Sequence, residues 1–250
     1  MPITRLVLLP GMDGTGILFE PLLEVLPAEW EPVVVRYPPD EALWYEELLE
    51  VVQAAIPADR PFVLPGESFS GPLALLMAAQ LSDAPGPERL QAVVLCASFV
   101  ACPLPWLPAA ICRLLDGAGI TSGMTLAASL LPASVTARLL LGDKATPELL
   151  RLLAEAHQQV SPKAMAARAR AILRVDVSDA LRACPVPLLY LRASDDRVIS
   201  ASSWKRIAEI RPDACLEELP GPHLILQTQP ALAMAAIERF LQAHNLPEKG

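Results

Sequence analysis

Three short segments carry residue types that can perform nucleophilic chemistry. Residues 64–71 read L-P-G-E-S-F-S-G and place Ser68 in a turn directly after a short apolar run. Asp196 follows another apolar run, in S-D-D-R-V, and His223 lies in P-G-P-H near the end of the chain. A serine that is activated by a histidine, which an aspartate orients, can attack a carbonyl carbon. These residues therefore predict acyl-transfer chemistry.

The residues around Ser68 favour a sharp turn between a strand and a helix. Gly66 stands two positions before the serine and Ser70 two positions after it. A strained apex needs small neighbours, because bulky side chains would collide with it. Ser70 occupies a position where glycine is usual, but it is small enough to keep the turn. We expect Ser68 to be the nucleophile at a helix N-terminus, where the dipole favours developing negative charge. The alternative is a turn serine that caps the helix expected over 71–81.

One histidine is the candidate for the general base, whereas two adjacent aspartates are candidates for the acid that orients it. His223 follows a turn near the end of the chain, and its side chain can reach Ser68 to act as general base and then as general acid. We expect His157 and His244 to be surface or interface residues. Asp195 and Asp196 could each orient the imidazole. The loop 97–101, A-S-F-V-A, contains no carboxylate, which removes the main alternative location for the acid.

A glycine-rich loop follows the first apolar run and reads L-P-G-M-D-G-T-G over 9–16. Such a loop can turn backbone N–H groups toward the nucleophile. We expect the N–H groups of Met12 and Phe69 to form an oxyanion hole. A phosphate loop is the other interpretation of these glycines, but the G-x-G-x-x-G spacing is absent.

Alternating apolar runs and helical patterns predict an α/β fold with a doubly wound, mostly parallel sheet. We expect strands at Arg5–Leu9, Pro32–Arg36, Phe62–Leu64, Gln91–Cys96, Pro187–Leu191 and Cys215–Leu219. We expect helices at Ala42–Ala55, Gly71–Leu81, Ser202–Ile210 and Ala231–His244.

The alternation stops between Cys102 and Ala183, where no strand is evident. We therefore expect residues 1–101 and 184–250 to form the core and residues 102–183 to form an all-helical cap or lid. Ordinary helices packed on the sheet are the alternative, although a crossover needs only one helix. The helical patterns cover Trp106–Leu115, Met124–Leu131, Val135–Leu141, Pro147–Gln159 and Pro162–Arg174.

Composition excludes several other classes of protein. The chain is 53% hydrophobic, which argues for a substantial core, and its net charge of −8 disfavours a nucleic-acid partner. Five scattered cysteines without C-x-x-C and three histidines without H-x-x-x-H disfavour a disulfide framework and a metal site. No P-loop motif, signal peptide or apolar run long enough for a membrane span is evident. We expect a cytoplasmic protein.

The motifs P-G-M-D-G-T-G, G-E-S-F-S-G, S-D-D-R-V and P-G-P-H-L together resemble those of the α/β-hydrolase superfamily with a helical cap. The first two look like a bacterial esterase/lipase-like branch and are similar to the hydrolase-like part of plant phytyl ester synthases. The resemblance implies ester hydrolysis through an acyl-enzyme without a cofactor. It favours Asp196 over Asp195, because a D-x-V-V-P-like segment follows the strand in that pattern. Pro10 departs from it, since many members have histidine there.

The cap region offers two hints about the substrate. It is rich in leucine and alanine, which suits an aliphatic acyl chain, although these residues could equally pack helix on helix. Lys163, Arg170 and Arg174 share one face of the helix expected over 162–174. This face is either simply solvated or a docking site for an acidic partner, such as acyl carrier protein or the phosphates of coenzyme A.

These observations predict a serine carboxylic-ester hydrolase for a small-molecule aliphatic acyl ester. Ser68 would attack the acyl carbonyl, His223 would carry the proton and Asp196 would orient His223. A thioesterase or acyl-carrier-protein ester hydrolase is the main alternative. An acyltransferase and a non-catalytic scaffold of the same fold are further alternatives.

Overall fold

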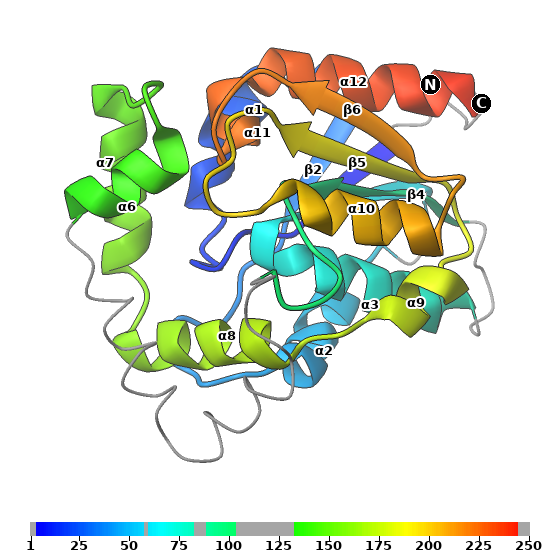
Figure 1. Ribbon diagram of the computed structural model, residues 1–250, viewed down its shortest axis with the longest axis horizontal. Helices are drawn as coiled ribbons and strands as arrows, with labels where there is room; N and C mark the ends of the chain where they lie inside the picture. The colour runs from blue at the N-terminus through cyan, green and yellow to red at the C-terminus, as the bar shows by residue number, and fades with distance from the viewer. Residues whose placement is uncertain (1–3, 58–59, 83–88, 104–132, 245–250) are drawn as a thin grey trace.

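A single parallel sheet of six strands forms the centre of the molecule (Figure 1). The computed structural model describes residues 4–57, 60–82, 89–103 and 133–244. The strand order is β2-β1-β3-β4-β5-β6, and every neighbouring pair is parallel. The strands are β1 (Thr4–Leu8), β2 (Trp30–Val34), β3 (Phe62–Glu67), β4 (Leu90–Cys96), β5 (Leu188–Ala193) and β6 (Cys215–Leu219).

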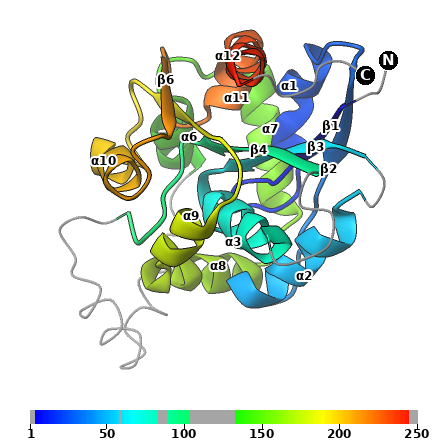
Figure 2. The same cartoon turned by 90° about the vertical axis from the view of Figure 1, so that its right-hand side faces the viewer.

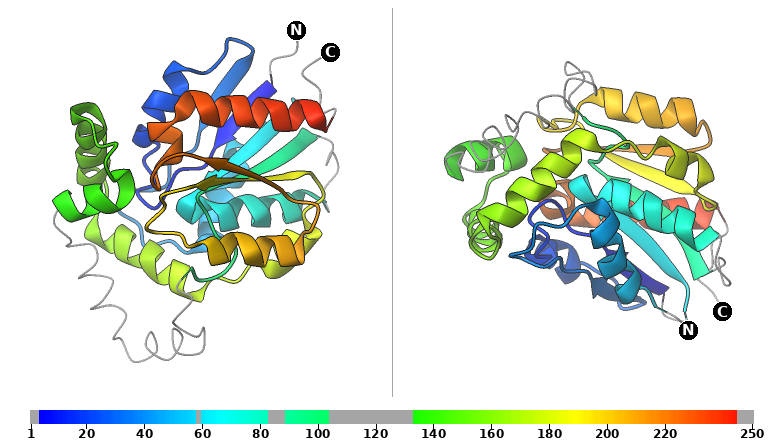
Figure 3. Two further views of the ribbon diagram at one scale, coloured as in Figure 1. Left: turned by 45° about the horizontal axis from the view of Figure 1, so that its top comes forward. Right: turned by 90° about the horizontal axis from the view of Figure 1, so that it is seen from below.

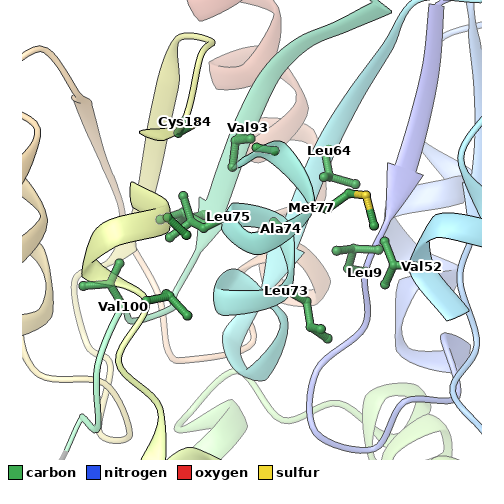
Figure 4. Packing of buried hydrophobic residues seen from close by; sticks show 14 of the residues in the cluster. Leu9, Val52, Leu64, Leu73, Ala74, Leu75, Met77, Val93, Val100 and Cys184 are labelled. Carbon is green, nitrogen blue, oxygen red and sulfur yellow. The ribbon is translucent and has the colours of Figure 1, made fainter. Parts of the chain in front are cut away.

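Helices cover both faces of this sheet, because its strands are apolar on both sides. One buried cluster packs strand side chains against α2 (Tyr45–Ala55), α3 (Gly71–Ser82), α9 (Ser178–Ala183) and α10 (Ala201–Ile210). The second cluster lies on the opposite face and includes side chains of α1 (Glu20–Glu24), α11 (Ile225–Thr228) and α12 (Pro230–Ala243). Figure 2 shows the two helical layers, and Figure 4 shows Leu73, Ala74 and Met77 of α3 within the first cluster. The predicted doubly wound α/β fold is confirmed.

The strand order brings the loop after β1 beside the end of β3. The chain runs from β1 to β2 on one side and then crosses to place β3 on the other side of β1. Parallel α/β sheets bind ligands at such a switch point, beyond the carboxyl ends of the strands. A bridge between Leu9 and Gly66 joins the two strand ends directly. The glycine-rich loop and the serine turn therefore start from adjacent points.

Strand β3 extends past the expected 62–64 and contains Pro65. Its ladder with β1 covers Phe62 and Val63 and resumes only at Gly66, so the interruption coincides with a residue that has no N–H. The Pro65 carbonyl still accepts a hydrogen bond from Leu9 at 2.9 Å. On the other side, Pro65 keeps its register with Val94 of β4.

Three helices of the insertion between β4 and β5 lie within the described residues. They are α6 (Ala133–Leu141), α7 (Pro147–Gln158) and α8 (Pro162–Arg174). Side-chain oxygens of Thr146 and Ser161 cap α7 and α8, each followed by proline at the first helical position. The helices expected over 106–115 and 124–131 lie outside the described residues.

The inserted helices stand beyond the carboxyl ends of the strands. The arrows of β5 and β6 point toward α6 and α7 in Figure 1. Figure 3 shows α8 next to α6 and α7, alongside the core. A small third cluster joins α6 and α7 to the core through Leu18 and Leu224. By contrast, α9 packs against α3 in the helical layer. Among the helices that the structure describes, none has the length and hydropathy needed to cross a bilayer.

Candidate active site

The turn after β3 holds Ser68 in a conformation that non-glycine residues rarely adopt. Its φ angle is 48°, in the left-handed region. A Cβ atom on Gly66 would lie 2.6 Å from the Ser70 carbonyl oxygen, and one on Gly71 would lie 1.9 Å from Ser98 Oγ. Gly66 therefore allows the close approach of the Ser70 backbone, and Gly71 leaves room for the Ser98 side chain. Such strain at a half-buried serine that lines a cavity is typical of a functional turn.

Ser68, His223 and Asp196 form one hydrogen-bonded chain. His223 Nε2 lies 2.9 Å from Ser68 Oγ. On the other side of the ring, His223 Nδ1 lies 3.0 and 2.9 Å from the two carboxylate oxygens of Asp196. With a proton on Nδ1, the ring donates to the carboxylate and its Nε2 can accept the serine proton. The geometry can therefore support transfer of a proton from Ser68 to His223.

Asp196 is held in place by its own loop. Its Oδ1 accepts hydrogen bonds from the backbone N–H groups of Val198 and Ile199, both at 2.8 Å. The side chains of His223 and Asp196 are only 3% and 7% exposed, so water screens their contact weakly. Asp195, the alternative acid, is exposed and accepts a hydrogen bond from Ser194 at 3.0 Å. The structure thus brings Asp196 to the imidazole.

The loop after β1 reaches the same place as Ser68. Gly11, Met12 and Ser68 line one cavity. Phe69, the other residue expected to supply an oxyanion N–H, is the middle residue of the short turn η2 (Ser68–Ser70) that leads into α3. Tyr45 Oη donates to the Phe69 carbonyl oxygen at 3.0 Å, and the two rings stack at 4.7 Å. The backbone that would hold an oxyanion is therefore firmly packed.

Ser70 does more than supply a small side chain. Its hydroxyl donates to the Pro10 carbonyl oxygen and lies 2.6 Å from Tyr37 Oη. Because the single Ser70 proton points to Pro10, Tyr37 must donate to Ser70. Burial raises the pKa of Tyr37, which keeps its phenol protonated at neutral pH. A glycine at position 70 could not make this link between the serine turn and the loop after β1.

A cavity of about 440 Å³ opens above Ser68 and His223. Its wall is mostly apolar, and much of it comes from the inserted helices. The aliphatic lining residues on those helices are Leu140, Leu153, Ala156, Met165 and Ile172. An apolar chamber of this kind suits an uncharged hydrocarbon group next to the reacting carbonyl.

The three histidines have different surroundings. His157 of α7 is exposed at the surface and also lines the cavity, which the sequence did not indicate. His244 is the residue directly after α12, and its ring packs against Phe240 at 4.4 Å. His223 alone contacts Ser68 and Asp196 among the described residues.

Glu67 is a buried carboxyl group directly before the serine. It is 2% exposed and accepts a hydrogen bond from Gln227 Nε2 at 2.9 Å. Burial raises the pKa of Glu67 from 4.5 to about 7, against the lowering effect of the Gln227 hydrogen bond. The nearby Asp13 carboxylate raises it further and His223 lowers it. Sequence reasoning did not identify Glu67 as part of the site.

This raised pKa predicts a dependence of stability on pH. Between pH 4.5 and about 7 the folded protein keeps a proton that the unfolded chain has released. Its contribution to the free energy of unfolding is therefore complete below pH 4.5 and is lost as the pH rises through 7, by on the order of 3 kcal/mol. Glu67→Gln has no proton to lose, so it should stabilise the protein more at pH 8 than at pH 5. Urea unfolding of both proteins at the two pH values measures this difference, and equal differences would contradict it.

The basic residues of α8 separate into two groups. Lys163 and Arg174 are exposed and Arg170 is half-buried; the guanidinium of Arg174 stacks on Trp44 at 5.0 Å. Arg168 lies instead on the buried face of α8 and hydrogen-bonds to the loop after β1. The sequence carried a signal for this, because Arg168 shares its helical face with buried alanines.

Comparisons with known proteins agree with this architecture. No family model matches the chain. A bromoperoxidase from Bacillus anthracis has a TM-score of 0.75 at 17% identity, over 96% of this chain and 92% of the other. Solved hydrolases of the same fold align with similar scores. The chain has the α/β-hydrolase fold.

Two curated proteins share sequence with part of the chain. A protein described as a carbamate hydrolase, from Caulobacter sp. (strain K31), is 34% identical over 82 residues, which are 32% of this chain and 31% of the relative. The 2-(acetamidomethylene)succinate hydrolase of Mesorhizobium japonicum is 32% identical over 84 residues, which are 33% of this chain and 30% of the relative. The chain thus spans about a third of the length of the curated relatives it matches.

Proposed function

We propose that the protein is a serine hydrolase that cleaves carboxylic esters of aliphatic acyl groups. The observation that carries this proposal is the hydrogen-bonded chain from Asp196 through His223 to Ser68 at the base of an apolar cavity. Both curated relatives are named as hydrolases, which supports the general class. The residues around the cavity support the finer assignment to an aliphatic ester.

The proposed reaction proceeds through an acyl-enzyme. Ser68 Oγ attacks the acyl carbon as its proton moves to His223 Nε2, and Asp196 stabilises the resulting imidazolium. The N–H groups of Met12 and Phe69 hold the oxyanion. The tetrahedral adduct collapses as the alcohol leaves with the proton from His223. Water then attacks the acyl-enzyme by the same steps, which releases the acid and restores Ser68.

The charges around the cavity favour a neutral substrate. Asp13 and Glu67 line it, and no lysine or arginine does so among the residues that the structure describes. The relative from Mesorhizobium is named for a succinate, which carries two carboxylates. A dianion of that kind would meet two carboxyl groups here without a cation, so we favour an uncharged acyl chain.

Hydrolysis of a p-nitrophenyl ester series from acetate to palmitate tests the function. Turnover should be highest with an aliphatic chain that fills the cavity and should fall for longer chains. The same acyl groups as coenzyme A thioesters distinguish a thioesterase, and added alcohol with detection of the new ester distinguishes an acyltransferase. Absence of turnover with every ester would contradict the proposal.

The exposed cations of α8 favour one refinement of the substrate. Lys163 and Arg174 stand where an acidic carrier could approach the cavity, since Met165 of the same helix lines its wall. Lys163→Glu combined with Arg174→Glu should raise KM for an acyl-carrier-protein ester by about 10-fold at low ionic strength, because steering charges are reversed. KM for a p-nitrophenyl ester is the matched control. Equal changes for both substrates would contradict docking at this face.

A further inference from the structure

A buried arginine joins the inserted helices to the loop after β1. The side chain of Arg168 is 1% exposed, and its neighbours on the buried face of α8 are alanines. Taking a guanidinium out of water is costly unless it gains strong hydrogen bonds. Aliphatic packing alone does not explain an arginine at this position, so its partners indicate its role.

Those partners are backbone carbonyl groups. Arg168 Nη1 donates to the carbonyl oxygens of Met12 at 3.0 Å and Asp13 at 2.7 Å, and Nη2 donates to Pro38 at 2.9 Å. The guanidinium also lies over the Tyr37 ring, 5.6 Å from its centre. Carbonyl acceptors fix the direction of the peptide groups that carry them. Arg168 therefore holds the loop after β1 in one backbone conformation.

The loop that Arg168 holds is a tight turn. The Gly14 N–H donates to the Gly11 carbonyl oxygen at 3.0 Å. In a trans peptide the C=O and N–H groups point in opposite directions, so this bond also sets the direction of the Met12 N–H. Arg168 fixes the next two peptides of the turn. Gly14 has a φ of +71°, and a Cβ on it would lie 2.7 Å from Arg168 Nη1.

The opposite side of the turn is held by the core. The Tyr37 N–H donates to the Gly14 carbonyl oxygen at 2.8 Å, and Tyr37 Oη reaches Ser70 in the serine turn. Ser70 in turn donates to the Pro10 carbonyl oxygen. The turn after β1 is thus held between the serine turn and α8. Loss of the α8 contact would leave only one of the two supports.

We propose that Arg168 is a positioning residue that fixes the loop after β1 so that the Met12 N–H faces the oxyanion formed at Ser68. This inference rests on the proposed function of Ser68. It assigns the inserted helices a part in stabilising the transition state, in addition to forming the cavity wall. Arg168 itself does not touch the reacting atoms.

A pair of ketone inhibitors tests this role. Ser68 adds to the carbonyl carbon of an alkyl trifluoromethyl ketone while its proton moves to His223, and the ketone oxygen becomes an oxyanion. The matched methyl ketone binds the same cavity without forming a stable adduct. Arg168→Met should weaken binding of the fluorinated ketone and lower kcat by about 10–100-fold, as expected for a misplaced oxyanion donor. Affinity for the methyl ketone and KM should change little.

Two further variants make the result decisive. Arg138→Met removes an exposed arginine of α6 and should leave both ketone affinities unchanged. Arg168→Gln keeps a hydrogen-bond donor and should give a smaller loss of the same kind; it replaces Arg168→Met if that variant does not fold. An equal loss for the two ketones, or no loss in a folded Arg168 variant, would overturn the inference. If Ser68→Ala retains activity and fluorinated-ketone affinity, the proposed function fails instead.

Discussion

Replacement of Ser68 by alanine should lower kcat for p-nitrophenyl ester hydrolysis by roughly 10³–10⁶-fold, the range seen for loss of a triad nucleophile. The variant removes the Ser68 hydroxyl, which hydrogen-bonds to His223 and faces the cavity. Substrate binding should be largely kept, because the apolar wall is unchanged. The residual rate would come from binding and from the backbone N–H groups alone.

The control for this experiment is a serine outside the site. Ser202 is exposed on α10 and hydrogen-bonds to Ser200. Ser202→Ala should hydrolyse the same ester at the wild-type rate. Intact mass after treatment with a fluorophosphonate gives a second measurement, since wild type should gain one phosphonyl group and Ser68→Ala none. Wild-type turnover by Ser68→Ala would exclude the proposed mechanism.

The arrangement of the strands was accessible from the sequence because buried parallel strands are short apolar runs separated by helical patterns. Residues at the carboxyl ends of such strands must meet at one edge of the sheet. This is why Ser68, Asp196 and His223 could be selected before the structure brought them into contact. Their catalytic roles stay predictions, as do the cap boundaries at 102 and 183 and the likeness to phytyl ester synthases.

Other features of the site depend on contacts that no local pattern contains. Tyr37 and Ser70 are 33 residues apart, and Arg168 reaches carbonyl groups more than 150 residues away in the loop after β1. In the sequence Glu67 looks like an ordinary polar residue, yet in the structure it is almost completely buried and hydrogen-bonded to Gln227. The periodicity of hydrophobic residues predicts where helices and strands lie in the sequence. A buried polar network forms only when those helices and strands pack together.

The choice between two adjacent aspartates gives the second large effect that we expect. Asp196→Asn should lower kcat by on the order of 10⁴-fold near neutral pH, as the same change does in a serine protease triad. An amide at this position can donate to Nδ1 and so favours the imidazole tautomer whose Nε2 carries a proton. That nitrogen then cannot accept the proton of Ser68, although the shape of the site is kept.

Asp195→Asn is the matched control, because it makes the same chemical change one residue earlier on an exposed side chain. It should retain kcat within a few-fold of wild type, since surface substitutions away from a site have small effects. Both variants can be assayed on one p-nitrophenyl ester across pH 6 to 10. The opposite ranking would assign the acid to Asp195. Similar small losses in both would mean that Asp196 only anchors its loop through Val198 and Ile199, and that His223 works without a carboxylate partner.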